Sequence, residues 1–108
     1  MISTHILDTS KGEPASAVEV ILEMKDSNGD FKVVDGGVTN SDGRYAFNDH
    51  QTAGVYRITF GIQNYYLSLK QESFFQDVQV SFEIKSTQRK YHVPLLLNPY
   101  GYSTYRGS

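Results

Sequence analysis

Alternation of apolar and polar side chains is the feature that most restricts the fold of this chain. In residues 78–84, VQVSFEI, every second side chain is apolar, and residues 18–25 and 55–60 follow the same pattern. Neighbouring side chains of a β-strand point to opposite faces, so a period of two places the apolar residues on one face. The pattern predicts antiparallel strands that pack one face on a core and expose the other to water.

Short turn sequences separate the alternating segments. Asn28-Gly29 and Asp42-Gly43 are both strong hairpin signals, because the tight turns of hairpins need residues that accept positive φ. We therefore expect each dipeptide to join two antiparallel neighbours. The predicted strands are residues 3–8, 17–25, 31–39, 44–48, 54–61, 77–85, 89–97 and 101–106, with a short helix near residues 64–70, where alternation is absent.

Short strands with at most one helix predict an all-β protein, a sandwich of two sheets. A chain of 108 residues suits a single domain, residues 1–108. With a net charge of −2 and no basic stripe, we expect no nucleic-acid or anionic-membrane partner. The sequence contains neither a secretory signal pattern nor an apolar run of the ~18 residues that a membrane span needs, so we expect a cytoplasmic location.

Three histidines could exchange protons near neutral pH. His5 and His92 lie in predicted strands, whereas His50 lies in a polar loop, FNDHQTAG, where a solvent-exposed turn role suffices. A single strand histidine is more often a surface or hydrogen-bonded residue than a catalyst. A zinc site would need a third protein ligand, and the sequence has no Cys and no HxH or HExxH pattern, so we expect no metal and no cofactor.

Other chemistry-bearing patterns are weaker. The GxSxG motif is absent, and no spacing singles out two of the 12 acidic residues as a catalytic pair. Arg44 begins a predicted strand directly after a tight turn. Taken alone, it is most simply a solubilising charge on an edge strand. A fixed guanidinium can also bind a planar, carbonyl-rich or anionic ligand through paired donors.

In chain order these segments form a specific pattern: STHILD near the start, NSDGRY in the middle and YHVPLLLNPYGYSTYRGS at the end. The pattern closely resembles the 5-hydroxyisourate hydrolases, the transthyretin-related enzymes of purine breakdown. The resemblance runs from residue 3 to the terminus. The final YRGS is its most specific part, because hormone-carrying transthyretins lack this tetrapeptide. The resemblance implies a transthyretin-like sandwich of eight strands that assembles as a homotetramer with its sites near a subunit interface.

The resemblance also implies which residues act. It assigns catalytic roles to His5, Arg44, His92 and Ser108, and substrate contacts to His5, Arg44, Tyr105, Arg106, Gly107 and Ser108. In transthyretin-like folds the strands that carry these residues are neighbours in one sheet, so we expect the side chains to share one polar pocket.

The implied reaction is cofactor-free hydrolysis of a ring amide of 5-hydroxyisourate. Its product is 2-oxo-4-hydroxy-4-carboxy-5-ureidoimidazoline. We assign His92 as the main acid–base group, and the sequence leaves open which histidine takes the proton.

Two other functions stay open: a non-enzymatic carrier of small molecules that resembles transthyretin, and an interaction module without a pocket. Two histidines, an arginine and a hydroxyl-rich tail favour a polar site over an apolar carrier channel. Independently of the resemblance, the run Leu95, Leu96, Leu97 directs at least one apolar side chain away from its own core. Exposed apolar surface of this kind predicts a partner subunit.

Overall fold

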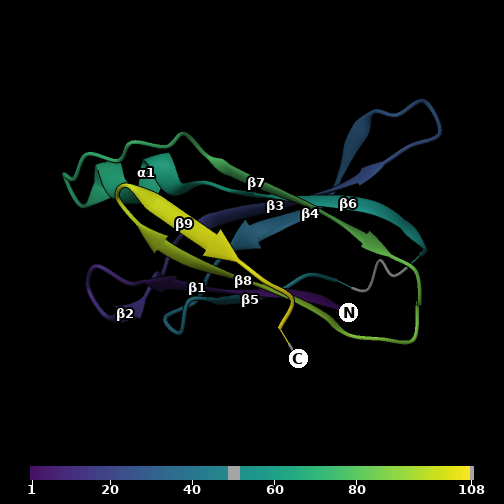
Figure 1. Cartoon of the computed structure of the whole chain (residues 1–108), viewed down its shortest axis with the longest axis horizontal. Helices are drawn as coiled ribbons and strands as arrows, with labels where there is room; N and C mark the ends of the chain where they lie inside the picture. The colour runs from purple at the N-terminus through teal and green to yellow at the C-terminus, as the bar shows by residue number, and fades with distance from the viewer. Residues whose placement is uncertain (49–51, 108) are drawn as a thin grey trace.

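Two β-sheets face each other in the computed structural model, which describes residues 1–48 and 52–107 (Figure 1). The predictions made for His50 and Ser108 therefore lie outside the described residues. The elements are β1 (Ile2–Asp8), β2 (Glu13–Pro14), β3 (Glu19–Lys25), β4 (Phe31–Val38), β5 (Arg44–Ala46), β6 (Gly54–Phe60), α1 (Ile62–Ser68), β7 (Val78–Ile84), β8 (Tyr91–Asn98) and β9 (Gly101–Thr104). The all-β sandwich with one short helix is confirmed.

One sheet carries the residues that the sequence singled out. Its order is β2–β1–β8–β9, and β5 also pairs with β1. Strand β1 runs parallel to β8, while β5 pairs antiparallel with the first half of β1 and β2 with its end. This confirms that the strands of residues 5, 44 and 92 and of the C-terminal segment are neighbours. The two-residue strand β2 was not predicted, because so short a segment carries no alternation.

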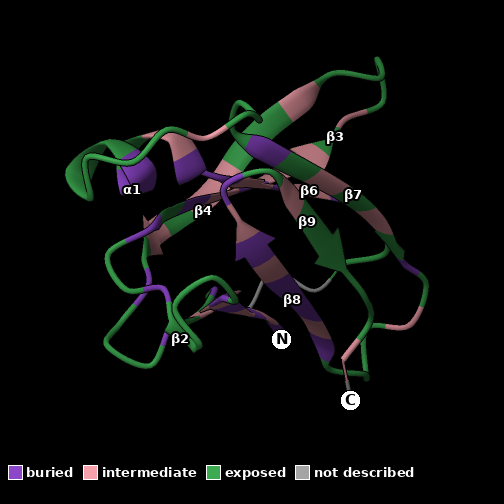
Figure 2. Cartoon of the chain, turned by 60° about the vertical axis from the view of Figure 1, so that its left-hand side comes forward, coloured by how far each residue is buried: buried purple, intermediate pink, exposed green. Residues whose placement is uncertain are grey.

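The other sheet has the order β4–β3–β6–β7 and is antiparallel throughout. Its inward side chains are those that the alternation predicted: Val20, Leu22, Ile58 and Phe60 are fully buried. Figure 2 shows buried residues recurring along the strands where the two sheets face each other. Burial of these apolar side chains is the main favourable term in the stability of such a sandwich.

The hairpin predicted at Asn28-Gly29 is confirmed. Strands β3 and β4 pair antiparallel on either side of it, and Gly29 has φ +85°. The Asp26 amide donates to the Asp30 carbonyl at 2.8 Å and closes the turn.

The hairpin predicted at Asp42-Gly43 is wrong. A tight turn does form, with Gly43 at φ +73° and the Arg44 amide donating to the Asn40 side chain at 3.0 Å. However, β4 pairs with β3 and β5 pairs with β1, so this turn carries the chain from one sheet to the other. Turn residues determine where the chain reverses its direction. They do not determine which strand the following segment pairs with. Here the Gly43 carbonyl accepts from the Ile6 amide at 2.8 Å and docks the turn on β1.

The helix α1 begins two residues earlier than predicted, directly after Gly61, and lies between β6 and β7 in the chain. Its buried side chains are Ile62, Tyr65 and Tyr66. The Tyr65 hydroxyl donates to the buried Asp8 carboxylate at 2.6 Å and ties the helix to β1. In the described part of the chain, no helix has the length and apolar character needed to cross a membrane.

Candidate functional site

The outer face of β1, β5 and β8 brings together residues from three distant parts of the chain. His5 lies opposite Arg44 in the β1–β5 pair, and Ser3 lies opposite His92 in the β1–β8 pair. Ser3 and His5 are two residues apart on one strand and therefore share a face. His5, Arg44 and His92, all predicted site residues, are thus neighbours on one sheet face.

His92 is held by a hydrogen bond across the sheet. The Ser3 hydroxyl lies 2.9 Å from Nδ1 of His92, and among residues 1–48 and 52–107 no hydrogen bond to its Nε2 is present. A neutral imidazole has one donor and one acceptor nitrogen, while a serine hydroxyl can serve as either. The contact therefore fixes the orientation of the ring and leaves Nε2 accessible to a ligand on this face.

The surroundings of both imidazoles lower their pKa and so favour the neutral form at pH 7. Partial burial lowers the pKa of His92, and the positive charge of Arg44 and the neighbouring His5 lower it further, against an opposing contact with the Ser3 backbone. Partial burial and Arg44 likewise lower the pKa of His5, while a hydrogen bond to the Asp42 backbone and the Asp42 charge oppose the shift. A neutral imidazole can accept a proton, which is what a general base requires.

A hollow of about 350 Å³ opens on this face. Its lining residues are Ser3, Thr4, Arg44, Tyr45, Ala46, Lys90 and His92. Arg44 and His92 contribute a guanidinium and an imidazole to the same space. A hollow of this size is within the usual range of ligand pockets, ~300–1,000 Å³.

The C-terminal segment of this chain reaches its own His92. The Gly107 amide donates to the His92 carbonyl at 2.8 Å, and the two residues form an isolated β-bridge. A Cβ atom added to Gly107 would lie 2.6 Å from Cδ2 of His92. The Gly107 backbone therefore lies directly against the imidazole ring.

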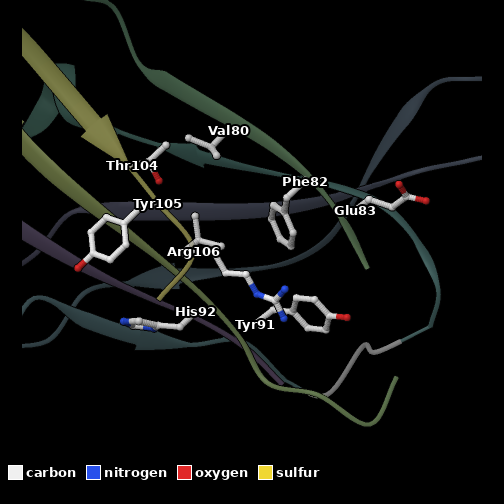
Figure 3. A pocket seen from close by; sticks show the side chains of 9 residues that line it. Val80, Phe82, Glu83, Tyr91, His92, Thr104, Tyr105 and Arg106 are labelled. Carbon is white, nitrogen blue, oxygen red and sulfur yellow. The ribbon is translucent and has the colours of Figure 1, made fainter. Parts of the chain in front are cut away.

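A second hollow, of about 160 Å³, lies on the inner side of the C-terminal segment. Its lining residues are Val80, Phe82, Glu83, Tyr91, His92, Val93, Thr104, Tyr105 and Arg106 (Figure 3). The predicted site residues are thus divided in this chain. Arg44 lines the outer hollow, Tyr105 and Arg106 line the inner one, and His92 lies between the two. The single shared pocket expected from the sequence is not formed by these residues in one chain.

Ser3 and Lys90 belong to this site and were missed from the sequence. Strand geometry could have identified both, because residues two apart on a strand lie on the same face. Ser3 precedes His5 by two residues, and Lys90 precedes His92 by two. Among the described residues, no group of three His, Cys, Asp or Glu side chains could hold a metal ion.

Comparisons with known proteins agree with this architecture. The model of the HIUase/Transthyretin family matches residues 2–107. A 5-hydroxyisourate hydrolase of Salmonella dublin is 47% identical over 111 residues, which cover 100% of this chain and 81% of that protein.

Two solved structures have the same fold over nearly their whole length. The 5-hydroxyisourate hydrolase of Klebsiella pneumoniae is 37% identical, with a TM-score of 0.87 over 99% of this chain and 98% of that one. Sea bream transthyretin in complex with thyroxine is 29% identical, with a TM-score of 0.92 over 98% of this chain and 93% of that one.

Proposed function

This chain belongs to the HIUase/Transthyretin family, and from that premise we propose that it is a single-domain hydrolase that opens a ring amide of 5-hydroxyisourate. The placement of His5, Arg44 and His92 on adjacent strands of one face carries the proposal. An uncharged ring amide reacts slowly with water at neutral pH. The site must therefore activate the water molecule as a nucleophile and stabilise the charge that develops on the carbonyl oxygen. These three side chains offer both kinds of help.

His92 is the main acid–base group in this mechanism. Its Nε2 takes a proton from the attacking water while the water oxygen bonds to the amide carbon, and the same nitrogen then gives the proton to the ring nitrogen as the carbon–nitrogen bond breaks. This requires the proton of the neutral ring to reside on Nδ1. The Ser3 hydroxyl oxygen, 2.9 Å from Nδ1, then accepts a hydrogen bond from it. His5 orients the water or shares the proton. The products are a ureido group and a carboxylic acid that ionises to a carboxylate and a proton released to solvent, so the step needs no oxidant or cofactor.

Arg44, Tyr105 and Ser108 bind the substrate in this scheme. The Arg44 guanidinium holds the carbonyl edge and stabilises the oxyanion that develops on it. The contacts that the resemblance implies in the C-terminal segment are Tyr105, Arg106, Gly107 and Ser108, of which the Tyr105 ring and the Ser108 hydroxyl place the heterocycle and the water.

The decisive experiment follows the ultraviolet absorbance of freshly made 5-hydroxyisourate with and without protein. Faster decay with the full chain, and its loss when residues 105–108 are deleted, supports the hydrolase. Decay at the rate of the protein-free control would contradict it. Formation of the ureidoimidazoline product, identified by NMR, would establish which ring amide is opened.

A carrier is the second candidate, favoured by the likeness to sea bream transthyretin in complex with thyroxine. The outer hollow of this chain contains Arg44, Lys90 and His92, a strongly polar set for an apolar ligand. Stoichiometric binding of thyroxine without hydrolysis of 5-hydroxyisourate would favour the carrier and reject the enzyme.

We also propose that the chain forms a homotetramer with the site near a subunit interface. Leu96 points away from the core between the buried Leu95 and Leu97, and it pairs with Leu7 on the outer face. At one end of the sandwich, Phe74 is 72% exposed and contacts Phe75, whose ring in turn meets Tyr102 on edge strand β9. These surfaces are of the kind that partner subunits cover. Sedimentation equilibrium gives the subunit number directly.

A further inference from the structure

Arg106 points away from the face that carries His5 and Arg44. Figure 3 shows the Arg106 side chain extending toward the Tyr91 ring while Tyr105 extends away from that ring. The guanidinium carbon lies 5.1 Å from the centroid of the Tyr91 ring. Within residues 1–48 and 52–107, no carboxylate forms an ion pair with Arg106, so the aromatic ring is its principal anchor.

The Tyr91 ring is itself fixed. It is only 7% exposed, and its hydroxyl donates to the Ser86 carbonyl at 2.9 Å and accepts from the Ser86 amide at 3.2 Å. A cation stacked on a ring held in this way is restrained as well. The contact between Arg106 and Tyr91 therefore ties the C-terminal segment to the start of β8.

On the opposite side of the segment, the next residue meets the imidazole. Gly107 donates its amide hydrogen to the His92 carbonyl at 2.8 Å, and its Cα is close enough to the ring that a Cβ would lie 2.6 Å from Cδ2 and 3.3 Å from Cγ. Tyr91 and His92 are consecutive, as are Arg106 and Gly107. Two adjacent contacts, Arg106 with Tyr91 and Gly107 with His92, thus hold residues 106–107 against residues 91–92.

We infer that Arg106 is a positioning residue, which holds Gly107 against the His92 ring by stacking on Tyr91 and does not itself contact the substrate. The inference rests on the proposed hydrolase function and assigns a separate role to one residue of the C-terminal tetrapeptide. Its physical basis is that His92 has one nitrogen bound to Ser3, while its ring packs against the Gly107 backbone. Release of the segment would let the ring leave the geometry that proton transfer requires.

Activity measurements separate positioning from substrate contact. In Arg106→Ala, we expect kcat to fall about tenfold, with KM changing less than about twofold, because ground-state binding is untouched. Arg106→Lys keeps a cation that can lie over the ring and should recover part of the loss. Tyr91→Phe keeps the ring but loses the two hydrogen bonds to Ser86, so its kcat should fall less than that of Tyr91→Leu, which should reproduce the loss. The double variant of Arg106→Ala and Tyr91→Leu should be no slower than either single variant.

Two NMR measurements on the substrate-free protein test the same inference without activity. Hydrogen exchange of the Gly107 amide should accelerate in Arg106→Ala, and the ring signals of His92 should move. Lys11→Ala is the matched control, since it removes another cation–aromatic contact, 5.9 Å from the Tyr65 ring, far from the C-terminal segment in the fold. It should leave both signals and kcat unchanged.

A raised KM with unchanged kcat, together with wild-type Gly107 exchange and His92 signals in Arg106→Ala, would overturn the inference and make Arg106 a substrate ligand. If the wild-type chain fails to hydrolyse 5-hydroxyisourate, the proposed function falls, and the two NMR signals still decide whether Arg106 clamps the segment. If Tyr91→Leu does not fold, the comparison of Arg106→Ala with Arg106→Lys and Tyr91→Phe decides alone.

Discussion

Ser3 and His92, 89 positions apart in the chain, form a hydrogen bond of 2.9 Å between the serine hydroxyl and Nδ1 of the imidazole. The bond exists because β1 and β8 run parallel in a register that places the two residues side by side. In the proposed mechanism the hydroxyl accepts a hydrogen bond from the Nδ1–H group, which favours the tautomer with an unprotonated Nε2. In this mechanism, a residue that transfers no proton itself orients the ring and selects its tautomer.

We therefore expect Ser3→Ala to lower kcat about 3–10-fold, the equivalent of one hydrogen bond of ~0.5–1.5 kcal/mol. Ser3→Thr keeps a hydroxyl on a strand position that suits a β-branched residue, and should retain most of the rate. Nitrogen-15 NMR of the imidazole should show the Nδ1–H tautomer in the wild type and a mixture in Ser3→Ala. An unchanged rate and tautomer in Ser3→Ala would mean that the serine does not orient His92.

Removal of the imidazole or the guanidinium should be far more costly. His92→Ala and Arg44→Ala should each lose at least ~100-fold in kcat, since acid–base help contributes on the order of 10²–10⁴-fold and one oxyanion donor on the order of 10²–10³-fold. Circular dichroism and melting temperature should stay near wild type. Lys32→Ala, which removes an exposed cation from β4 in the other sheet, is the matched control and should be silent. Loss of less than about tenfold in both variants would reject the mechanism.

The pH dependence of the rate should follow the lowered pKa values of the imidazoles. Protonation removes the base, so kcat/KM should fall as the pH drops through a pKa that lies below 6.5. Because the charge of Arg44 disfavours the imidazolium, Arg44→Gln should raise the pKa of His92 and move the acid limb to higher pH. Comparison of the pH–rate profiles of His5→Asn and His92→Asn identifies the proton acceptor. If neither variant slows hydrolysis, the histidine mechanism is wrong.

The sequence predicted the strands that carry the site, but not every contact between them. Alternation identified β3, β6 and β7 because one face of each strand is buried. The family resemblance identified His5, Arg44 and His92 because each lies in a specific short motif. Contacts across the sheet need more, since they depend on register and on which strands become neighbours.

Two elements illustrate this limit. At Asp42-Gly43 the local turn was correct and its partner strand was wrong, because the Ile6 amide, distant in sequence, binds the turn. The stacking of Arg106 on Tyr91 could not be inferred either, because nothing local to the tetrapeptide specifies a ring 15 positions earlier.

The buried Asp8 carboxylate should make folding stability depend on pH. Burial alone would raise the pKa of Asp8, but hydrogen bonds from Ser10, Tyr65 and the Lys11 backbone outweigh it and lower the pKa below 3.8. Because the pKa of Asp8 is lower in the folded state, its carboxylate stabilises the fold at any pH above its pKa in the unfolded state. That contribution is lost as the pH falls through the pKa of the folded state.

Tyr65→Phe should therefore lower the free energy of unfolding by about 1.5–3 kcal/mol at neutral pH, the range for a hydrogen bond to a charged group. The loss should shrink in acid, at a pH below the lowered pKa of Asp8, where the carboxylate becomes protonated. Urea unfolding at both pH values measures it. Tyr66→Phe is the control, because the buried Tyr66 hydroxyl has no hydrogen-bond partner among the described residues and its removal should cost little. Equal effects of the two substitutions would reject the assignment.

Gly107→Ala tests whether contact between the C-terminal segment and the imidazole is part of catalysis. The new Cβ would lie 2.6 Å from Cδ2 of His92 and 3.3 Å from Cγ of Pro94, so either the segment or the ring must move. Because Gly107 is partly exposed and lies beyond the end of β9, the segment can yield without disturbing the core, and the melting temperature should stay near wild type.

Movement of the segment or of the His92 ring should lower the catalytic rate. We expect kcat of Gly107→Ala to fall at least about tenfold, since a shift of ~1 Å in a catalytic group can cost far more than the contact itself. If loss of contact is the cause, the His92 ring signals should move in the same direction as in Arg106→Ala, because both changes separate the segment from the ring. Wild-type kcat with shifted ring signals would instead show that the rate tolerates movement of His92, and the reacting proton would then have to be assigned to His5.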